Sequence, residues 1–444
     1  MNCLRYGIVL WLIFLGTGTA AASDWPTFKH DNSRVGYTAD PLRAALTLRW
    51  IYSASEAPQK AWPGPGGEVI EGLHLRHRMR FDDVFHTAMA AGKAIFGSSV
   101  DNHVYAYDCD SGELLWSFST NGPVRLAPTV ANGKVYVGSD DGFAYCLNAD
   151  DGSLIWKLRA APRDERILAR GRMSSRWPVR TSVLVDKGVA YFGAGTFPHE
   201  NVYLLAADAE TGDRLWLNDS VSQRDAGRSD FTPQGYLLAS NDLLFVPSGR
   251  TLPAAFNRST GQLVYKQRGG GKQVGGTQNL LTEDQLYTVG EHNILAMGQT
   301  GGSILGKLPA RQITFDGDIA FLATGKEISA VAVPLFPGKT ESAHFDVRPD
   351  FTAGDPDAAK RSNQPIRYHV VHFGGFRSAF KSILPPPKPR GSVLAVAATL
   401  LASVAVVVPR CGLAIACNSV RLPAGYRRKS HSKSTAAFRA VFER

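Results

Sequence analysis

The chain has 444 residues, of which 44% are hydrophobic and 10% aromatic, so it can bury a large core and is not globally disordered. Its formal net charge of +10 is unevenly placed. Residues 331–444 contain 17 Lys and Arg against 6 Asp and Glu, whereas residues 1–330 contain 32 against 33. The body of the chain is therefore neutral, which excludes a basic nucleic-acid-binding surface across it.

The first 22 residues have the three parts of a secretory signal peptide. Arg5 supplies a positive start, Tyr6–Leu15 is an apolar run too short to span a membrane, and Ala20–Ala22 offers a small-residue cleavage site. A buried N-terminal core segment is the alternative. The signal predicts a mature protein outside the cytoplasm, either periplasmic or secreted.

In the N-terminal region, Leu46, Leu48 and Trp50 alternate with polar residues as in a half-buried strand. A repeated sequence motif follows this region. The two clearest copies are AYDCDSGELLW and CLNADDGSLIW, and their tryptophans are 40 residues apart. Four copies have an Asp or Asn, a Gly and an aromatic residue at Asp108, Gly112 and Trp116; at Asn148, Gly152 and Trp156; at Asp208, Gly212 and Trp216; and at Asn257, Gly261 and Tyr265. A degraded fifth copy has Gly301, with Leu305 in the aromatic position.

The residues of this motif predict a hairpin that packs against a neighbouring sheet. Asp or Asn bonds the backbone two residues on, and Gly supplies a positive φ. The aromatic side chain four residues later can pack on the next sheet, burying roughly 150–250 Å². A period of this length predicts an all-β propeller of four-stranded blades, with an open solenoid of stacked sheets as the alternative. We expect five blades over residues 84–308 and two strands of a sixth over residues 313–329.

One unit of the repeat contains an insertion, because Trp156 and Trp216 are 60 residues apart. The insertion contains Trp177 and seven arginines, which are Arg159, Arg163, Arg166, Arg170, Arg172, Arg176 and Arg180. Loops on propeller faces often carry binding sites, so we consider a ligand or partner site here, with solvated surface arginines as the alternative.

The repeat ends near residue 330. We expect residues 1–22 to be the signal, residues 23–330 the propeller, residues 331–390 an irregular Pro-containing linker, and residues 391–444 an apolar segment with a basic tail. Residues 391–408 are uncharged, and no Asp or Glu occurs from residue 358 to 442. Three interpretations of the tail stay open: a transmembrane helix that would associate residues 391–408 with the membrane, a disordered extension, and the product of a shifted reading frame.

The repeat from Ala106 to Trp116 resembles the tryptophan-docking repeat of pyrroloquinoline-quinone (PQQ)-like β-propellers, a superfamily that includes quinoprotein alcohol dehydrogenases and BamB. The resemblance covers about residues 24–330. It implies a ring of seven or eight blades, in which an N-terminal strand, here Leu46–Tyr52, completes the last blade.

The resemblance also implies a cofactor that the sequence supports poorly. Quinoprotein dehydrogenases of the family hold the quinone between a Trp and a disulfide of adjacent cysteines, beside a Ca²⁺ ion bound by Glu, Asn and Asp. This chain has no adjacent cysteines and no such carboxylate cluster, and Cys109 and Cys146 form either a disulfide or two buried thiols. Only Arg176, Trp177 and Arg180 offer a stacking and clamping set for an anionic quinone, with a structural inter-blade Trp as the alternative.

No motif for phosphate binding, nucleophilic catalysis or metal ligation occurs in the sequence. We therefore expect no catalytic residue, no metal site and no cofactor, with PQQ kept as the alternative. The first hypothesis is a non-catalytic extracytoplasmic scaffold that binds a protein or cell-envelope partner. The alternatives are a PQQ-dependent oxidoreductase and the propeller part of a larger enzyme.

Overall fold

The computed structural model describes only part of the chain. The described residues are 24–40, 48–61, 69–70, 73–74, 82, 84–169, 172–222, 230–249, 251–266, 278–289, 293–317, 319–324, 327–332 and 371–372. The predicted signal peptide and residues 391–444 lie outside them.

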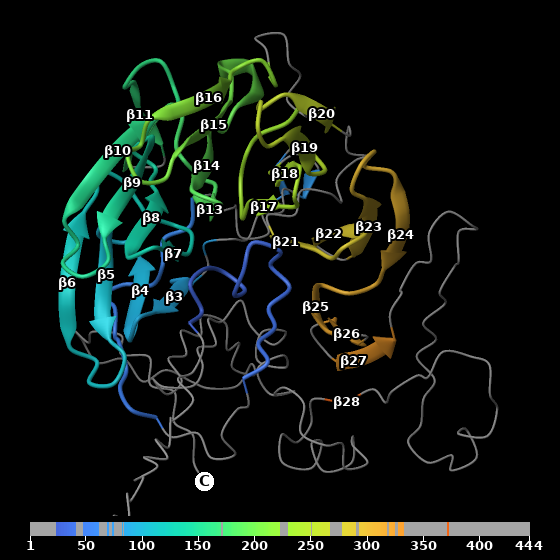
Figure 1. Cartoon of the computed structure of the whole chain (residues 1–444), viewed down its shortest axis with the longest axis horizontal. Coiled ribbons are helices and arrows are strands. Elements are labelled where there is room, and N and C mark those ends of the chain that lie inside the picture. Colours follow the sequence, from blue (N-terminus) through green and yellow to red (C-terminus); the bar gives the residue numbers. More distant parts are fainter. Residues whose placement is uncertain are drawn as a thin grey trace, which may run out of the picture.

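The described strands form six antiparallel four-stranded sheets arranged around a centre (Figure 1). The first three sheets consist of β3 (Thr87–Ala90), β4 (Lys93–Gly97), β5 (His103–Asp108) and β6 (Leu114–Ser119); of β7 (Thr129–Ala131), β8 (Lys134–Gly138), β9 (Phe143–Asn148) and β10 (Leu154–Arg159); and of β13 (Leu184–Asp186), β14 (Val189–Ala194), β15 (Tyr203–Asp208) and β16 (Arg214–Asn218).

The next three sheets follow in chain order. They consist of β17 (Leu238–Ala239), β18 (Leu243–Val246), β19 (Ala254–Asn257) and β20 (Leu263–Lys266); of β21 (Gln278–Leu281), β22 (Gln285–Val289), β23 (Ile294–Gly298) and β24 (Ile304–Leu308); and of β25 (Gln312–Asp316), β26 (Ile319–Ala323), β27 (Glu327–Ala332) and β28 (Val371–His372). Two small hairpins, β1–β2 (Val69–Ile70 and Leu73–His74) and β11–β12 (Arg166–Ala169 and Arg172–Ser175), and a 3-10 turn, η1 (Pro198–Glu200), complete the described elements.

This arrangement confirms the predicted all-β propeller of four-stranded blades. Each sheet is a meander whose first strand lies nearest the centre, and β7 contacts both β3 and β13 there (Figure 1). All five blades expected over residues 84–308 are present. The sixth sheet has four strands rather than two, and its outermost strand, β28, comes from the range for which we expected an irregular linker.

The repeated glycine and tryptophan make the contact between neighbouring blades. A Cβ atom added to Gly152 would lie 2.6 Å from the Trp116 ring, and one added to Gly212 would lie 2.8 Å from the Trp156 ring. The Trp116 indole N–H also donates to the carbonyl oxygen of Ala149 in the next blade at 3.0 Å. The predicted packing of each aromatic residue on the next sheet is therefore confirmed, and glycine is required because its missing Cβ leaves room for the ring.

In the degraded fifth copy of the repeat, the turn glycine lies one residue later than the sequence predicts. Gly302, not Gly301, has the positive φ of +66°, and a Cβ added to it would lie 2.4 Å from the Tyr265 ring. The aromatic position is then Gly306, which pairs with Ala296 as Trp116 pairs with Ala106. The expectation of Leu305 at that position is wrong, because two successive glycines leave the turn ambiguous in sequence.

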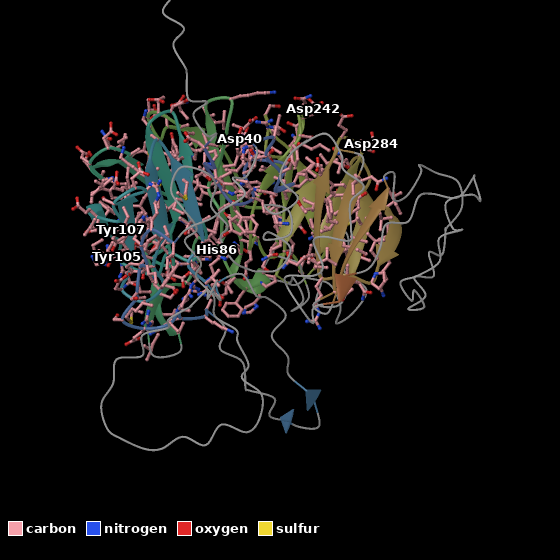
Figure 2. The ribbon with its side chains drawn as sticks, turned by 90° about the horizontal axis from the view of Figure 1, so that it is seen from below. Asp40, His86, Tyr105, Tyr107, Asp242 and Asp284 are labelled. Carbon is pink, nitrogen blue, oxygen red and sulfur yellow. The ribbon has the colours of Figure 1, made fainter. Side chains whose placement is uncertain are left out.

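Trp50 provides the same contact for the first blade, which has no preceding described sheet. Its indole N–H donates to the carbonyl oxygen of Cys109 at 2.9 Å, and a Cβ added to Gly112 would lie 2.5 Å from its ring. It also stacks on Tyr107, which is labelled in Figure 2. Residues 48–52 do not form the expected strand, and residues 46–47 lie outside the described chain. Trp50 nevertheless fills the place of the docking aromatic of a preceding blade.

The segment from Asp24 to Thr38 passes through the centre of the ring, as the blue coil in Figure 1 shows. It makes hydrogen bonds to all six sheets, in each case at or beside the innermost strand. The bonds join Trp25 to Met89 (2.7 and 2.8 Å), Pro26 to Val130 (2.7 Å), Asn32 to Val185 (2.9 Å), Arg34 to Leu237 (3.2 Å), Ser33 to Leu281 (2.7 Å) and Val35 to Thr314. This one segment therefore links blades that are far apart in the sequence.

Neither Cys109 nor Cys146 forms a disulfide, and both thiols are buried, so the second of the two alternatives for these cysteines is confirmed. Burial raises the pKa of the Cys146 thiol to about 12. The two residues therefore serve as small apolar core groups rather than as a disulfide.

We expect Gly152→Ala to lower the free energy of unfolding by about 2 kcal/mol or more, because the new Cβ must displace Trp116 and the residue keeps a positive φ. Gly133→Ala is the matched control: Gly133 has a φ of +70° but nothing within 4 Å of the added Cβ, so only the backbone cost of about 1 kcal/mol applies. Urea denaturation measures both losses. Equal losses in the two variants would contradict the docking role of Gly152.

Candidate functional site

The insertion predicted between Arg159 and Arg180 forms the β11–β12 hairpin between the second and third blades. Arg166 pairs with Ser175, Leu168 with Met173, and Ala169 with Arg172. Isolated two-stranded hairpins are marginally stable in water, so this one depends on contacts with the blades.

Backbone and side-chain hydrogen bonds fix the hairpin to the first two blades. The Ser175 N–H donates to the carbonyl oxygen of Asp140 at 2.8 Å, which joins β12 to the loop between β8 and β9. The Arg172 guanidinium donates to the carbonyl oxygens of Ser99 at 2.8 Å and Val100 at 3.2 Å, in the loop between β4 and β5. The hairpin is thus held in one orientation over two neighbouring blades.

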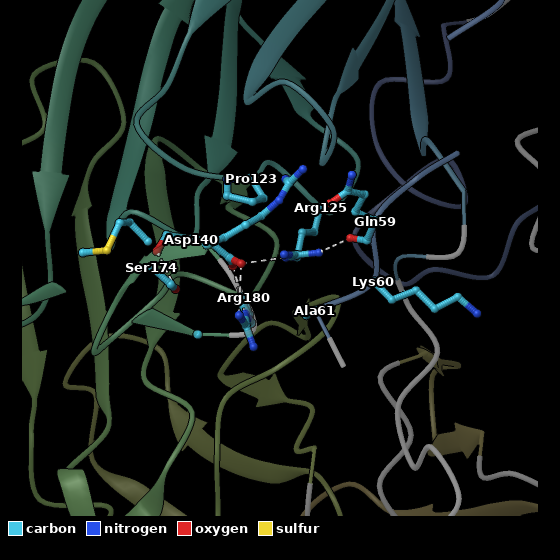
Figure 3. Close-up of a pocket in the computed structure, with 11 residues that line it drawn as sticks. Gln59, Lys60, Ala61, Pro123, Arg125, Asp140, Ser174 and Arg180 are labelled. Atoms are coloured by element: carbon cyan, nitrogen blue, oxygen red, sulfur yellow. Dashed lines mark hydrogen bonds and ion pairs between the residues drawn. The ribbon is translucent and has the colours of Figure 1, made fainter. Parts of the chain in front are cut away.

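A pocket of about 250 Å³ lies between the hairpin and the blades (Figure 3). One wall comes from the hairpin and another from the segment that follows Trp50. Its lining residues are Gln59, Lys60, Ala61, Pro123, Arg125, Asp140, Ala169, Arg172, Met173, Ser174 and Arg180. The pocket therefore occurs at the place where the 40-residue period is interrupted.

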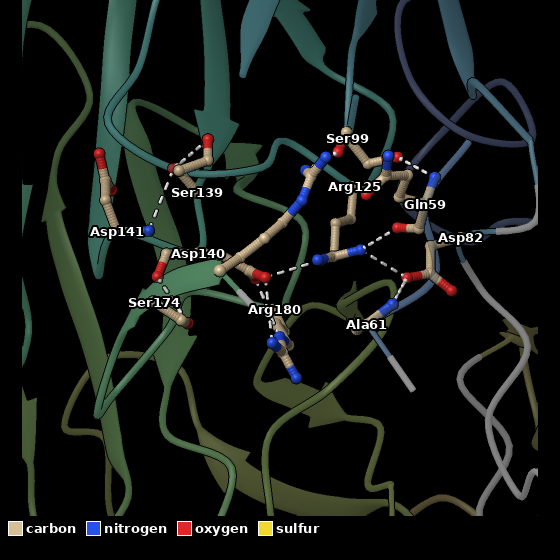
Figure 4. A network of polar contacts seen from close by, with 12 residues as sticks. Gln59, Ala61, Asp82, Ser99, Arg125, Ser139, Asp140, Asp141, Ser174 and Arg180 are labelled. Atoms are coloured by element: carbon tan, nitrogen blue, oxygen red, sulfur yellow. Dashed lines mark hydrogen bonds and ion pairs between the residues drawn. The ribbon is translucent and has the colours of Figure 1, made fainter. Parts of the chain in front are cut away.

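Four buried charged groups form a network beside this pocket (Figure 4). Asp140 accepts hydrogen bonds from Arg125 Nε at 2.7 Å and from Arg180 Nε and Nη2 at 2.9 and 3.0 Å. Arg125 Nη1 also donates to Asp82 Oδ2 at 2.9 Å and to the carbonyl oxygen of Gln59 at 2.5 Å. Each of the four side chains is at most 7% exposed, so the network is shielded from water.

The two carboxyl groups respond differently to this burial. Burial alone would raise the pKa of Asp140, but the charges and hydrogen bonds of Arg125 and Arg180 outweigh it and hold the pKa below its usual value. Asp82 contacts one guanidinium instead of two, and burial raises its pKa despite the opposing charge of Arg125. Asp140 is therefore the ionised centre of the network.

Of the three residues suggested for a cofactor, only Arg180 lines the pocket. Arg176 forms ion pairs with Glu165 and with Glu200. Trp177 is 4% exposed, donates its indole N–H to the carbonyl oxygen of Glu200 at 2.7 Å, and has the Arg176 guanidinium 5.3 Å from its ring centre. The three side chains thus have different surroundings.

The other arginines of the insertion are mostly paired at the surface. Arg163 lies 2.9 Å from Glu165, and Arg166 lies 3.7 Å from Asp164. Arg170 lies outside the described residues. Arg172, like Arg180, lines the pocket.

These surroundings do not fit a PQQ site of the quinoprotein type. The Trp177 ring is covered by Arg176 and by Tyr203, whose ring meets it edge-on with 6.0 Å between centroids. The described cysteines form no disulfide, and the described residues contain no group of three His, Cys, Asp or Glu that could hold a metal ion. We therefore assign no step to a quinone.

Sequence reasoning missed Asp82, Arg125 and Asp140. The loop between β8 and β9 offers a weak sequence signal, because it has two acids, Asp140 and Asp141, before Gly142, and Asp141 is the one that bonds within the turn. Its carboxylate accepts from the N–H of Phe143 at 3.0 Å and from the hydroxyl of Tyr145 at 2.5 Å. Asp140 is the additional acid, and its partners are 15 and 40 residues away.

We expect Asp140→Asn to lower the free energy of unfolding at pH 7 by about 3 kcal/mol, because it removes the charge between two buried guanidinium groups. Since the folded-state pKa of Asp140 lies below its unfolded value, the carboxylate stabilises the fold above about pH 4 and loses this effect as the pH falls through the folded pKa. Urea denaturation from pH 3 to 7 should show the difference between the two proteins narrowing at the acid end.

Asp151→Asn is the control, because Asp151 is an exposed turn residue of the same blade whose pKa is lowered by hydrogen bonds from Ser153. Its effect should be much smaller at every pH. A loss for Asp140→Asn that did not change between pH 3 and 7 would contradict an ionised Asp140.

Comparisons with known proteins agree with the propeller fold. Residues 76–196 match a PQQ-repeat family model described as outer membrane protein assembly factor BamB. Among solved structures, the chain is similar to the quinohemoprotein alcohol dehydrogenase from Comamonas testosteroni, with a TM-score of 0.50 and 16% identity over 70% of this chain and 58% of that one. A europium-containing methanol dehydrogenase gives a TM-score of 0.50 and 13% identity, with 70% of each chain covered.

BamB from Moraxella catarrhalis gives a TM-score of 0.43 and 15% identity over 55% of this chain and 70% of that one. Comparison with curated protein sequences gives no match. At these identities the solved structures show the fold alone, and the chain spans 58% of the length of the Comamonas enzyme. Residues 76–196 therefore match a PQQ-repeat family model, and the described sheets have a β-propeller fold like that of the two dehydrogenases.

Proposed function

We propose that this protein is a non-catalytic extracytoplasmic propeller scaffold that binds a protein partner of the cell envelope. The observation that carries the proposal is an exposed apolar face on the β11–β12 hairpin. Leu168 is 73% exposed and Met173 is 52% exposed, and the two side chains are direct cross-strand neighbours. Adjacent exposed apolar groups on an insertion are typical of a protein contact site.

The hairpin is ordered before any partner arrives. Its hydrogen bonds to Asp140, Ser99 and Val100 fix the backbone that carries Leu168 and Met173. Binding then requires little additional ordering of the chain, which favours affinity.

The rims of the blades offer further apolar groups at one position of the repeat. Leu114, Leu154, Leu263 and Ile304 lie two residues before the aromatic position of their outer strands, and each is at least 40% exposed. These side chains add contact area around the ring and support the same kind of function.

The family match supports an envelope partner, since its description is that of an assembly factor for outer membrane proteins. The predicted signal peptide supports a location outside the cytoplasm. In the described part of the chain, no helix has the length and apolar character needed to cross a membrane. Residues 391–408, proposed as a membrane-associated segment, lie outside that part.

A PQQ-dependent oxidoreductase is the second candidate, favoured by the likeness of the fold to the two dehydrogenases. The propeller part of a larger enzyme is a third, because the chain spans 58% of the length of the Comamonas protein. Addition of PQQ and Ca²⁺ to the purified protein tests the second candidate. Quinone absorbance that survives gel filtration, together with dye-linked alcohol oxidation, would replace the scaffold proposal.

Position-specific photo-crosslinking in intact cells tests the scaffold directly. We expect a photoreactive residue at Leu168 to give an adduct of one defined mass, because this side chain is the most exposed apolar group of the hairpin. A photoreactive residue at Asp242, an exposed turn position in the fourth blade labelled in Figure 2, is the control and should give no such adduct. The companion substitution Met173→Asp should abolish the adduct at Leu168. Equal adducts at both positions, or none at either, would contradict the proposal.

A further inference from the structure

We propose that the pocket beside the β11–β12 hairpin binds a small oxyanion, a carboxylate or phosphate group. The inference concerns the pocket alone and does not require a partner at Leu168 and Met173. It rests on the charge of the lining, on unused N–H groups of Arg125, and on the position of Arg172.

The lining is strongly cationic for its size. It contains four cationic side chains, Lys60, Arg125, Arg172 and Arg180, and one carboxylate, Asp140. Asp82 adds a second carboxylate through its contact with Arg125. Arg172 is the lining cation with which no carboxylate of the described chain pairs, and this favours an anion in the space beside it.

Arg125 directs unused donors toward the pocket. A guanidinium has five N–H groups, and the bonds to Asp140, Asp82 and Gln59 occupy Nε and Nη1. Within the described chain, no residue accepts a hydrogen bond from its Nη2. Arg125 lines the pocket, so an acceptor bound in the pocket can take hydrogen bonds from these two N–H groups.

Arg172 adds a charge that its neighbours do not neutralise. Its hydrogen bonds go to the carbonyl oxygens of Ser99 and Val100, which hold the guanidinium in place but carry no net charge. A fixed guanidinium suits the planar geometry of a carboxylate and the oxygens of a phosphate. The bonds thus position the charge of Arg172 at the pocket without cancelling it.

The volume limits the size of the ligand. A pocket of about 250 Å³ is smaller than sites for drug-sized molecules, which begin at roughly 300 Å³. It suits a small free anion or the acidic side chain of a bound protein. Both sources present the same oxyanion chemistry.

Isothermal titration calorimetry of the full chain at low salt, with three probes, tests the proposal. The probes are inorganic phosphate, succinate and the blocked peptide acetyl-Gly-Glu-Gly-amide. We expect saturable binding of at least one of them. Saturation by phosphate or succinate alone identifies a free anion as the source, and saturation by the peptide alone identifies a protein side chain.

Two variants and a control connect the binding to the pocket. Arg172→Gln should weaken binding about tenfold, the effect of one charge-assisted contact. Lys60→Glu should also weaken it, because it reverses a charge at an exposed position of the lining. Arg163→Gln, on the same insertion but outside the lining, should bind like the parent protein.

Unchanged melting temperatures confirm that each variant is folded. Failure of all three probes to saturate the parent protein would overturn the proposal. Equal affinity in Arg172→Gln and Arg163→Gln would also overturn it, because binding would then not involve the pocket.

Discussion

The contact of an indole ring with a glycine of the next blade is the constraint on which the rest of the structure depends. The ring of Trp116 occupies the space that a Cβ on Gly152 would fill, and its N–H is satisfied by Ala149. The contact therefore sets both the distance and the relative orientation of two sheets. The packing of the blades also fixes the pocket, because Arg125, Asp140 and Arg180 lie in loops that join or cap three successive blades.

The central segment provides a second, longer-range constraint. Its polar groups form hydrogen bonds at or beside the innermost strands of all six sheets. The segment therefore links the blades along the axis of the ring, whereas the tryptophans link neighbouring blades near the rim. Two buried cations lie in this segment. Burial lowers the pKa of Lys29 to about 8 and that of Arg34 to about 10, and both side chains donate to backbone carbonyl oxygens. The segment is thus held by directional hydrogen bonds that a purely apolar segment would lack.

Features that depend on residues close together in the sequence are predictable, whereas contacts between residues far apart in the sequence are not. The Asp–Gly–Trp turn is complete within about ten residues, so the docking contact was predictable in residue detail. The turn at Gly301 and Gly302 was misplaced, because only the backbone conformation distinguishes two adjacent glycines. Asp82 and Asp140 lie 43 and 15 residues from Arg125, and each of the three resembles an ordinary surface charge until the fold buries it. The insertion can be recognised in the sequence, because it interrupts a regular period.

The interruption of the period explains why this pocket lies beside the β11–β12 hairpin. A regular repeat gives every blade equivalent loops, and such loops cannot create a local concentration of cations. The insertion supplies Arg172 to a network that already contains Arg125, Asp140 and Arg180. Asp140 neutralises the inner guanidinium groups and so stabilises the junction of the blades, while Arg172 lies between carbonyl oxygens and keeps its charge. Substitution of Asp140 therefore acts on the junction of the blades, whereas substitution of Arg172 removes a charge at the pocket together with a contact that holds the hairpin.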